Sequence, residues 1–139
     1  MASMPTILIV DDDAVIRGML YELFSEKYEC HTASTAEEAF QYLEVETYDA
    51  ILTDIAMPGL TGIELLKRVQ LRDSDTPVIL ISGKGNEQDP QQLIALGAFA
   101  YVSKPFKLTE IEEAVEQAIA SKESEETTQP LRAEEKERP

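Results

Sequence analysis

Two spacings of apolar residues alternate along residues 5–120. Five short runs of apolar and β-branched residues have the length and composition of buried strands. These runs are Ile7–Val10, Tyr28–Thr32, Ala50–Thr53, Val78–Ile81 and Ala98–Val102. After each run, apolar residues recur with the 3.6-residue period of a helix that buries one face. The five apolar stripes are Val15, Met19, Leu20, Leu23 and Phe24; Ala36, Ala39, Phe40 and Leu43; Ile63, Leu66 and Val69; Leu93, Ile94 and Leu96; and Ile111, Val115, Ala118 and Ile119. The pattern predicts five consecutive strand–helix units.

Residues that favour helix ends agree with this division. Thr35 and Thr109 each precede a glutamate by three positions, which is the spacing of a capping box. Pro90 suits the first position of a helix, and Gly97 suits the position after its last turn. Strands that alternate with helices indicate βαβ units, and therefore a parallel sheet with helices on both faces. We expect an α/β fold of three layers, α/β/α, with (βα)₅ organisation.

The last nineteen residues have a different composition. Residues 121–139 contain six acids, four bases and two prolines, and their single large apolar residue is Leu131. Such a segment cannot bury an apolar face of its own. We expect one domain over residues 5–120, followed over residues 121–139 by an acidic, disordered tail or linker stub.

The overall composition is that of one globular domain. The chain has 139 residues, of which 43% are hydrophobic and 28% charged, which is enough for one core and too few for two ordinary domains. No apolar run is long enough to cross a membrane, and residues 1–5 lack the basic and apolar regions of a signal peptide. A single cysteine, Cys30, and a single histidine, His31, exclude a disulfide framework and a Cys/His zinc site. We expect a cytoplasmic protein without membrane contacts.

The charge is strongly acidic. Acidic residues outnumber basic ones by 27 to 12, so the net charge is −15. The acids and bases of residues 121–139 nearly cancel, and the acidity therefore belongs to the predicted domain. This charge repels a phosphate backbone, so we expect no direct binding to nucleic acid. Good solubility and cation binding both agree with it, and composition does not choose between them.

Polar and charged residues follow four of the five predicted strands. In an open parallel sheet, ligands bind beyond the carboxyl ends of the strands. The residues at those ends are Asp11-Asp12-Asp13 after the first strand, Asp54 after the third, Ser82 after the fourth and Ser103-Lys104-Pro105 after the fifth. We expect these side chains to meet at one edge of the fold.

Carboxylates that meet at one edge repel one another unless a cation or a proton lies between them. Each pair costs roughly 1–4 kcal/mol at about 4 Å, depending on the effective dielectric constant. Asp13 has a simpler explanation as the N-cap of the first helix, but this does not explain Asp54 on another strand. Carboxylate and carbonyl oxygens favour Mg²⁺, with Mn²⁺ as an alternative. Lys104 supplies a countercharge and Ser82 a hydroxyl donor, so the set suits phosphoryl transfer with Asp54 as the nucleophile.

At these residues the chain resembles the response-regulator receiver domain of two-component signalling, the CheY-like group. The residues that carry the resemblance are Val10-Asp11-Asp12, Asp54-Ile55-Ala56-Met57-Pro58-Gly59 with Gly62, Ser82, and Lys104-Pro105. The resemblance covers residues 5–120. It implies a doubly wound, flavodoxin-like sheet of five parallel strands in the order 2-1-3-4-5.

The resemblance also implies a role for each matching residue. Asp54 accepts a phosphoryl group from the phosphohistidine of a sensor histidine kinase or phosphotransfer protein. Mg²⁺ is held by Asp11, Asp12 and Asp54 together with the backbone carbonyl of Ala56. Lys104 pairs with the phosphoryl oxygens, and its bond to Pro105 is expected to be cis.

Two further residues are implied to act in the response to phosphorylation. Ser82 turns toward the phosphoryl group, and Tyr101 moves from outside to inside. This changes the face formed by the fourth helix, the fifth strand and the fifth helix, where a downstream protein binds. The resemblance therefore implies that the protein is a switch and not an enzyme. It would be either a stand-alone receiver or part of a larger regulator, and either a monomer or a dimer that forms on phosphorylation. Ala56 and Lys84 occupy the variable positions that tune the access of water to the acyl phosphate.

Three other functions fit parts of the sequence. A haloacid-dehalogenase-type phosphatase would use Asp11 as the nucleophile in the pattern Asp11-x-Asp13, but it leaves Asp54 unexplained. An interaction module without phosphorylation would not need the complete set of acidic and basic residues. A flavin-binding protein of the same fold would need a phosphate loop after the first strand, where three aspartates would repel the phosphate. Arg17, on the predicted first helix, is interpreted as part of a solvated face.

Overall fold

The structure, a computed structural model, describes residues 4–73, 75–83 and 89–137. Five parallel strands form one sheet in the order β2-β1-β3-β4-β5, which confirms the expected topology. The elements in chain order are β1 (Thr6–Val10), α1 (Ala14–Phe24), β2 (Glu29–Ala33), α2 (Ala36–Val45), β3 (Ala50–Asp54), α3 (Gly62–Arg72), β4 (Val78–Ser82), α4 (Pro90–Ala95), β5 (Ala100–Ser103) and α5 (Leu108–Glu137).

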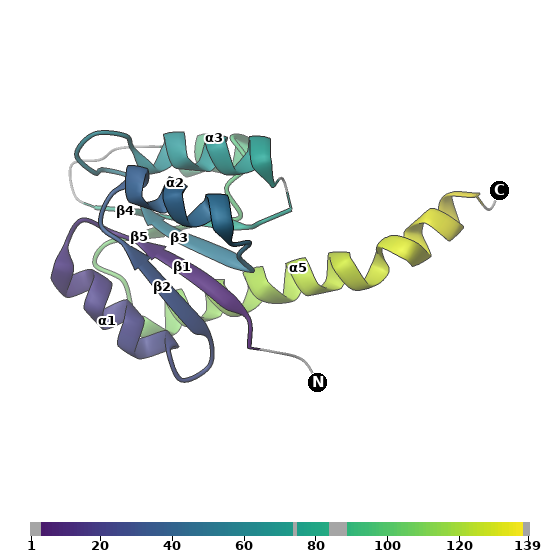
Figure 1. The fold of residues 1–139 in the computed structure, drawn as a ribbon, viewed down its shortest axis with the longest axis horizontal. Coiled ribbons are helices and arrows are strands. Elements are labelled where there is room, and N and C mark those ends of the chain that lie inside the picture. The colour runs from purple at the N-terminus through teal and green to yellow at the C-terminus, as the bar shows by residue number, and fades with distance from the viewer. Residues whose placement is uncertain (1–3, 74, 84–88, 138–139) are drawn as a thin grey trace.

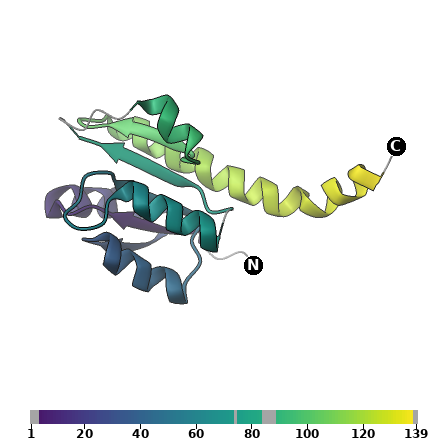
Figure 2. The same ribbon diagram turned by 90° about the horizontal axis from the view of Figure 1, so that it is seen from above.

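The sheet separates two apolar cores. Successive residues of a strand point to opposite faces, so Leu8 and Val10 enter one core while Ile7 and Ile9 enter the other. The first core is closed by α2, α3 and α4, and the second by α1 and α5. Figures 1 and 2 show the resulting three layers, with the helices on both faces of the sheet. All five residues of β3 and of β4 are buried, as expected for central strands of a covered parallel sheet.

Helix ends agree with the sequence at most positions. Asp13 caps α1, with its side chain accepting hydrogen bonds from the amides of Val15 and Ile16. Thr35 caps α2, Pro90 opens α4, and Gly97 follows α4 with a φ of 111°, a conformation that favours glycine.

One predicted capping box is wrong. Thr109 lies inside α5, which begins one residue earlier at Leu108. A reciprocal capping box occurs instead at the start of α3, where the Thr61 hydroxyl accepts from the amide of Glu64 and the Glu64 carboxylate accepts from the amide of Thr61. The Thr-x-x-Glu spacing fits both places, and only the packing of the helix decides where the helix begins.

Four residues of the predicted apolar stripes are exposed. Val15 and Met19 of α1 are 77% and 36% exposed, and Ile94 and Leu96, in and just after α4, are 47% and 39% exposed. The 3.6-residue spacing correctly predicts that these segments are helices, but it predicts a wider buried face than the helices have. In α4 the buried residue is Leu93.

The C-terminal helix continues further than the sequence predicted. α5 extends to Glu137, past the expected domain end at residue 120, and Figures 1 and 2 show it leaving the body of the protein. Residues 121–137, expected as a disordered tail or linker stub, are therefore helical here; residues 138 and 139 lie outside the described residues. Lys122 is 7% exposed, and its Nζ donates a hydrogen bond of 3.0 Å to the carbonyl of Tyr48. Hydrophobic periodicity cannot reveal such a segment, because glutamate, lysine and alanine favour helix without burying a face. The boundary at residue 120 itself stays a prediction.

Within the described residues, no helix combines the length and the hydropathy needed to cross a membrane.

Candidate functional site

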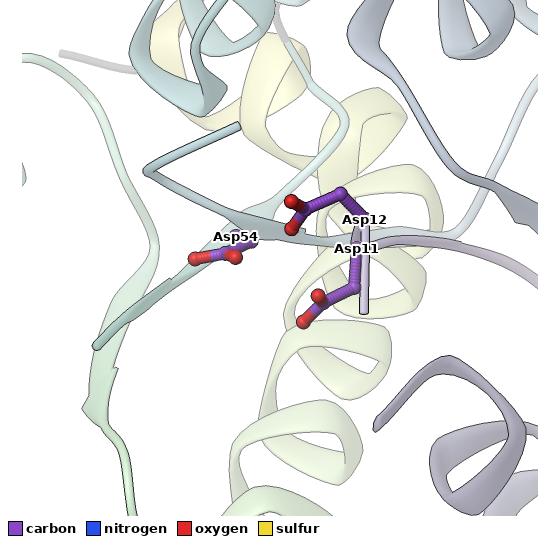
Figure 3. A group of neighbouring side chains, drawn as sticks. All are labelled: Asp11, Asp12 and Asp54. Atoms are coloured by element: carbon purple, nitrogen blue, oxygen red, sulfur yellow. The ribbon is translucent and has the colours of Figure 1, made fainter. Parts of the chain in front are cut away.

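The carboxyl ends of β1 and β3 bring three aspartates together. Val10 pairs with Thr53 across these strands, so Asp11 and Asp54, the next residues along, lie side by side. Asp12 follows Asp11 in the loop that leads to α1. One carboxylate oxygen from each aspartate lies within 4.8 Å of the other two, and Figure 3 shows the three carboxylates facing a common space. The sequence prediction that these residues meet at one edge is confirmed.

Hydrogen bonds fix Asp11 in this group. Asp11 is fully buried, and its amide donates to the carbonyl of Ala33 at 3.1 Å. Its Oδ1 accepts from the amide of Asp13 at 2.9 Å, and its Oδ2 accepts from Lys104 Nζ at 3.2 Å. Its backbone carbonyl accepts from Arg17 Nη1 at 2.8 Å. Arg17 is therefore in contact with the acidic group, contrary to its interpretation as part of a solvated face.

Lys104 connects the two buried carboxylates. Its amide donates to the carbonyl of Ser82 at 2.7 Å, which places it directly beyond β4 and β5. Its Nζ lies 3.2 Å from Asp11 Oδ2 and 3.3 Å from Asp54 Oδ2. The bond between Lys104 and Pro105 is cis, as the family resemblance implied.

Burial and charge act on these groups in opposite directions. Burial raises the pKa of Asp54, and the charge of Asp11 raises it further, whereas Lys104 acts to lower it; the pKa is raised overall. Burial acts to lower the pKa of Lys104, but the two carboxylates beside it outweigh that effect and raise it. The site thus holds a charged lysine next to a carboxylate whose ionised form is destabilised.

The group has the properties of a divalent metal site. Asp54 is 5% exposed, and within residues 4–73, 75–83 and 89–137 its buried Oδ1 finds no hydrogen-bond partner. An unpaired buried acceptor is costly unless a ligand satisfies it. The donors are carboxylate oxygens, with no cysteine or histidine in the group. Such oxygens suit Mg²⁺, and also Mn²⁺, better than zinc. The residues present therefore fit Mg²⁺.

The loop after Asp54 is held tightly against the strand. A Cβ on Gly62 would lie 2.2 Å from the backbone oxygen of Asp54, so only glycine permits this approach. The Gly62 amide donates to the carbonyl of Ile55 at 2.9 Å. Ala56, whose carbonyl the resemblance assigned to the metal, lies exposed in this loop. Met57 is 7% exposed and packs into the first core, where it anchors the loop.

The two residues expected to respond to phosphorylation lie on neighbouring strands. Ser82 ends β4 and is 2% exposed, with its hydroxyl 3.5 Å from the carbonyl of Gly83. Tyr101 lies on β5, is half-buried, and packs against the first core. Its hydroxyl accepts a hydrogen bond of 3.2 Å from Ser103. Lys84, the other variable position, lies outside the described residues.

The geometry does not favour the phosphatase alternative. In the pattern Asp11-x-Asp13 the second aspartate would have to face the reacting group. Asp13 instead caps α1, accepting from the amides of Val15 and Ile16. Asp11 is buried and already bonded through both carboxylate oxygens.

Comparison with known proteins gives the same family as the motifs. The chain matches the Response regulator receiver domain family over residues 7–116. It is 37% identical to Sporulation initiation phosphotransferase F of Bacillus subtilis over 84% of this chain and 94% of that protein. It is 40% identical to the Phosphate regulon transcriptional regulatory protein PhoB of Pseudomonas aeruginosa over 76% of this chain, but it spans only 48% of that protein.

A solved structure supports the fold. The CheY-like response regulator receiver domain protein of Methanospirillum hungatei superposes with a TM-score of 0.82 at 30% identity, covering 88% of this chain and 99% of that one. Receiver domains bind Mg²⁺ at an acidic pocket and act as signalling switches rather than true enzymes. The chain belongs to the response regulator receiver domains of two-component signalling.

Proposed function

We propose that the chain is a phosphorylation-activated switch in which Asp54 accepts a phosphoryl group from a phosphohistidine on a partner protein. The observation that carries the proposal is the state of the Asp54 carboxylate. One oxygen is paired with Lys104, while the other is buried and has no hydrogen-bond partner among the residues that the structure describes. A carboxylate arranged in this way offers an oxygen that a metal ion or a phosphoryl group can contact without first breaking a hydrogen bond.

The transfer exchanges one bond to phosphorus for another. A carboxylate oxygen of Asp54 attacks the phosphorus, and the bond from phosphorus to the donor's imidazole nitrogen breaks. The imidazole keeps the electron pair of that bond and leaves as a neutral ring when its other nitrogen carries a proton. The product is an acyl phosphate on Asp54. The ammonium of Lys104, already 3.3 Å from Asp54, pairs with the added negative charge.

Asp11, Asp12, Asp54 and the backbone carbonyl of Ala56 would hold the metal. When bound, Mg²⁺ neutralises charge on the phosphoryl oxygens. Asp11 and Asp12, which follow β1, would contribute two of these carboxylates, and Asp54, at the end of β3, the third. Lys104 supplies the countercharge from the carboxyl end of β5.

The response of the protein uses the strands next to the site. Ser82 lies at the end of β4, next to Asp54 on β3, and turns toward the phosphoryl group in the phosphorylated state. Tyr101 follows by moving inward, which changes the face formed by α4, β5 and α5. Ile94 of α4 and Leu96, just after it, are 47% and 39% exposed, so apolar surface for a downstream protein is available at α4.

The partners follow from the same proposal. The phosphodonor is a sensor histidine kinase or a phosphotransfer protein, and neither nucleic acid nor membrane is bound directly. The protein works in the cytoplasm, as a stand-alone receiver or as the receiver part of a larger regulator. It is a monomer or a dimer formed on phosphorylation. Its chemistry is limited to its own phosphorylation from a phosphodonor and a slow loss of the phosphoryl group.

The test is phosphorylation by a small phosphodonor. The purified chain is incubated with Mg²⁺ and acetyl phosphate, and the intact mass is followed beside that of Asp54→Asn. We expect the unaltered chain to gain one phosphoryl group that hydroxylamine removes, and the variant to gain none. Asp13→Asn is the matched control, since it removes a carboxylate close by in sequence that faces the helix, and it should be labelled normally. Equal labelling of the unaltered chain and Asp54→Asn would refute the assignment of Asp54.

A further inference from the structure

The guanidinium of Arg17 reaches back from the start of α1 to the acidic group. Its Nη1 donates a hydrogen bond of 2.8 Å to the backbone carbonyl of Asp11. That carbonyl belongs to the peptide unit that joins Asp11 to Asp12. The side chain of Arg17 is half-buried, so this bond is partly shielded from water. Arg17 thus holds the piece of backbone between two of the three carboxylates.

Asp11 and Asp12 depend on this bond to different degrees. Asp11 is also fixed through its amide and through both carboxylate oxygens. Asp12 is exposed, and among the described residues no hydrogen bond or ion pair to its carboxylate is found. The direction of the Asp12 side chain is therefore set by its own backbone, whose preceding peptide unit is the one that Arg17 holds.

We propose that Arg17 is a positioning residue for the metal site. By fixing the peptide unit between Asp11 and Asp12, it keeps the Asp12 carboxylate within reach of Asp54 and so raises the affinity for Mg²⁺. This inference rests on the proposed function, because it deepens the metal site described there. It assigns a role to a side chain that touches none of the reacting groups.

The positioning role of Arg17 and its positive charge predict opposite effects of its removal on the affinity for Mg²⁺. A cation beside the carboxylates repels Mg²⁺, so if charge alone mattered, removing Arg17 would tighten Mg²⁺ binding by roughly a few-fold. If positioning dominates, removing Arg17 releases Asp12 and weakens the binding. The loss of a residue that orients a metal ligand typically lowers metal affinity by about 10-fold to 100-fold. The sign of the change therefore separates the two.

The experiment is a calorimetric titration of the metal-free chain with MgCl₂. The variants are Arg17→Met, Arg17→Gln and Arg17→Lys. The matched control is Lys67→Met, which removes one exposed positive charge on α3, a helix on the opposite face of the sheet from α1. Thermal melts in EDTA establish beforehand that each variant is folded. We expect the dissociation constant for Mg²⁺ to rise about tenfold in Arg17→Met and Arg17→Gln. Arg17→Lys should recover part of the affinity, and Lys67→Met should not differ from the unaltered chain.

A second readout does not use the metal. The amide resonances of Asp12 and Asp54 in ¹⁵N NMR spectra of the metal-free protein should shift in Arg17→Met and not in Lys67→Met. Unchanged or tighter Mg²⁺ binding by Arg17→Met would overturn the positioning role while leaving the proposed function intact. Failure of the unaltered chain to bind Mg²⁺, or binding that Asp12→Asn leaves unchanged, would contradict the metal site itself and this inference with it.

Discussion

Removing the charge of Asp12 should stabilise the protein without metal and destabilise it relative to the unaltered chain when Mg²⁺ is present. The three carboxylates lie within 4.8 Å of one another. Lys104 is bonded to Asp11 and Asp54, whereas no such partner is found for the Asp12 carboxylate within the described residues. Asp12 therefore contributes mainly repulsion when no cation is bound.

The size of the effect follows from the separation. Two unit charges 4.8 Å apart repel by about 0.9 kcal/mol in a water-like dielectric and by about 3.5 kcal/mol at an effective dielectric constant of about 20. Asp12 is exposed, so the lower value applies to each of its two neighbours, and the attraction of Lys104 offsets part of the total. We expect Asp12→Asn to raise the free energy of unfolding by about 1 kcal/mol in EDTA, which corresponds to a melting temperature higher by about 2–8 °C.

With Mg²⁺ bound, the unaltered chain should instead be more stable than Asp12→Asn. A ligand that binds only the folded state stabilises it by about 2.7 kcal/mol at one hundred times its dissociation constant. Asp12→Asn lacks one of the proposed carboxylate ligands, so its gain in stability at the same Mg²⁺ concentration should be smaller. Urea unfolding followed by circular dichroism, in EDTA and over a series of Mg²⁺ concentrations, measures both effects. The two stability curves should cross as Mg²⁺ rises.

Asp13→Asn is the control for this experiment. Asparagine caps a helix as well as aspartate does, so the variant removes one negative charge next to Asp12 without removing a member of the three-carboxylate group. Its stability should change little and should respond to Mg²⁺ as the unaltered chain does. If Asp12→Asn were less stable than the unaltered chain in EDTA, repulsion would not be the dominant effect of Asp12. The reasoning above would then be refuted.

Three further predictions follow from particular contacts. Burial and a neighbouring carboxylate raise the pKa of Asp54, so the folded state keeps this proton to a higher pH than the unfolded chain does. The contribution of Asp54 to the free energy of unfolding should therefore fall as pH rises above about 4, and urea titrations should show a smaller fall for Asp54→Asn than for the unaltered chain. Gly62→Ala should lower the free energy of unfolding by about 2 kcal/mol or more, because the added Cβ clashes with the Asp54 backbone oxygen. Gly18 lies within α1, and a Cβ there would have no neighbouring atom within 4 Å. Gly18→Ala should therefore raise the free energy of unfolding by about 1 kcal/mol in the same assay. Lys122→Ala should lower the melting temperature, because the buried carbonyl of Tyr48 loses its hydrogen bond from Lys122. Leaving such a carbonyl without a partner costs about 1–3 kcal/mol. An unchanged melting temperature would show that the end of the folded body lies before this residue.

The sheet and the acidic group could be predicted from the sequence because both depend on short-range patterns. A parallel sheet places the carboxyl ends of its strands at one edge, so the positions of Asp11, Asp54 and Lys104 along the chain were enough to predict that they meet. The cap at Asp13 was predicted for the same reason, since it acts within one helical turn.

The contacts of long side chains could not be predicted in this way. Arg17 and Lys122 each donate a hydrogen bond to a backbone carbonyl. Neither the spacing of apolar residues nor a motif predicts which group the end of such a long side chain will contact. The position of Arg17, shortly after the cap of α1, is the one available signal, and it does not distinguish a bonded arginine from a solvated one. The start of α5 was misplaced because the Thr109 spacing satisfies the capping rule without the packing that would select it.

The bonds of Lys104 span a large part of the chain. Its partner Asp11 is 93 residues away in sequence and its partner Asp54 is 50 residues away. The site therefore joins the first, third and last strands of the sheet, and no fragment that lacks either end of the domain can contain it. The proposed Mg²⁺ binding and phosphorylation of Asp54 therefore require the whole fold. Both should be lost when the domain unfolds globally and should be insensitive to local opening at its ends.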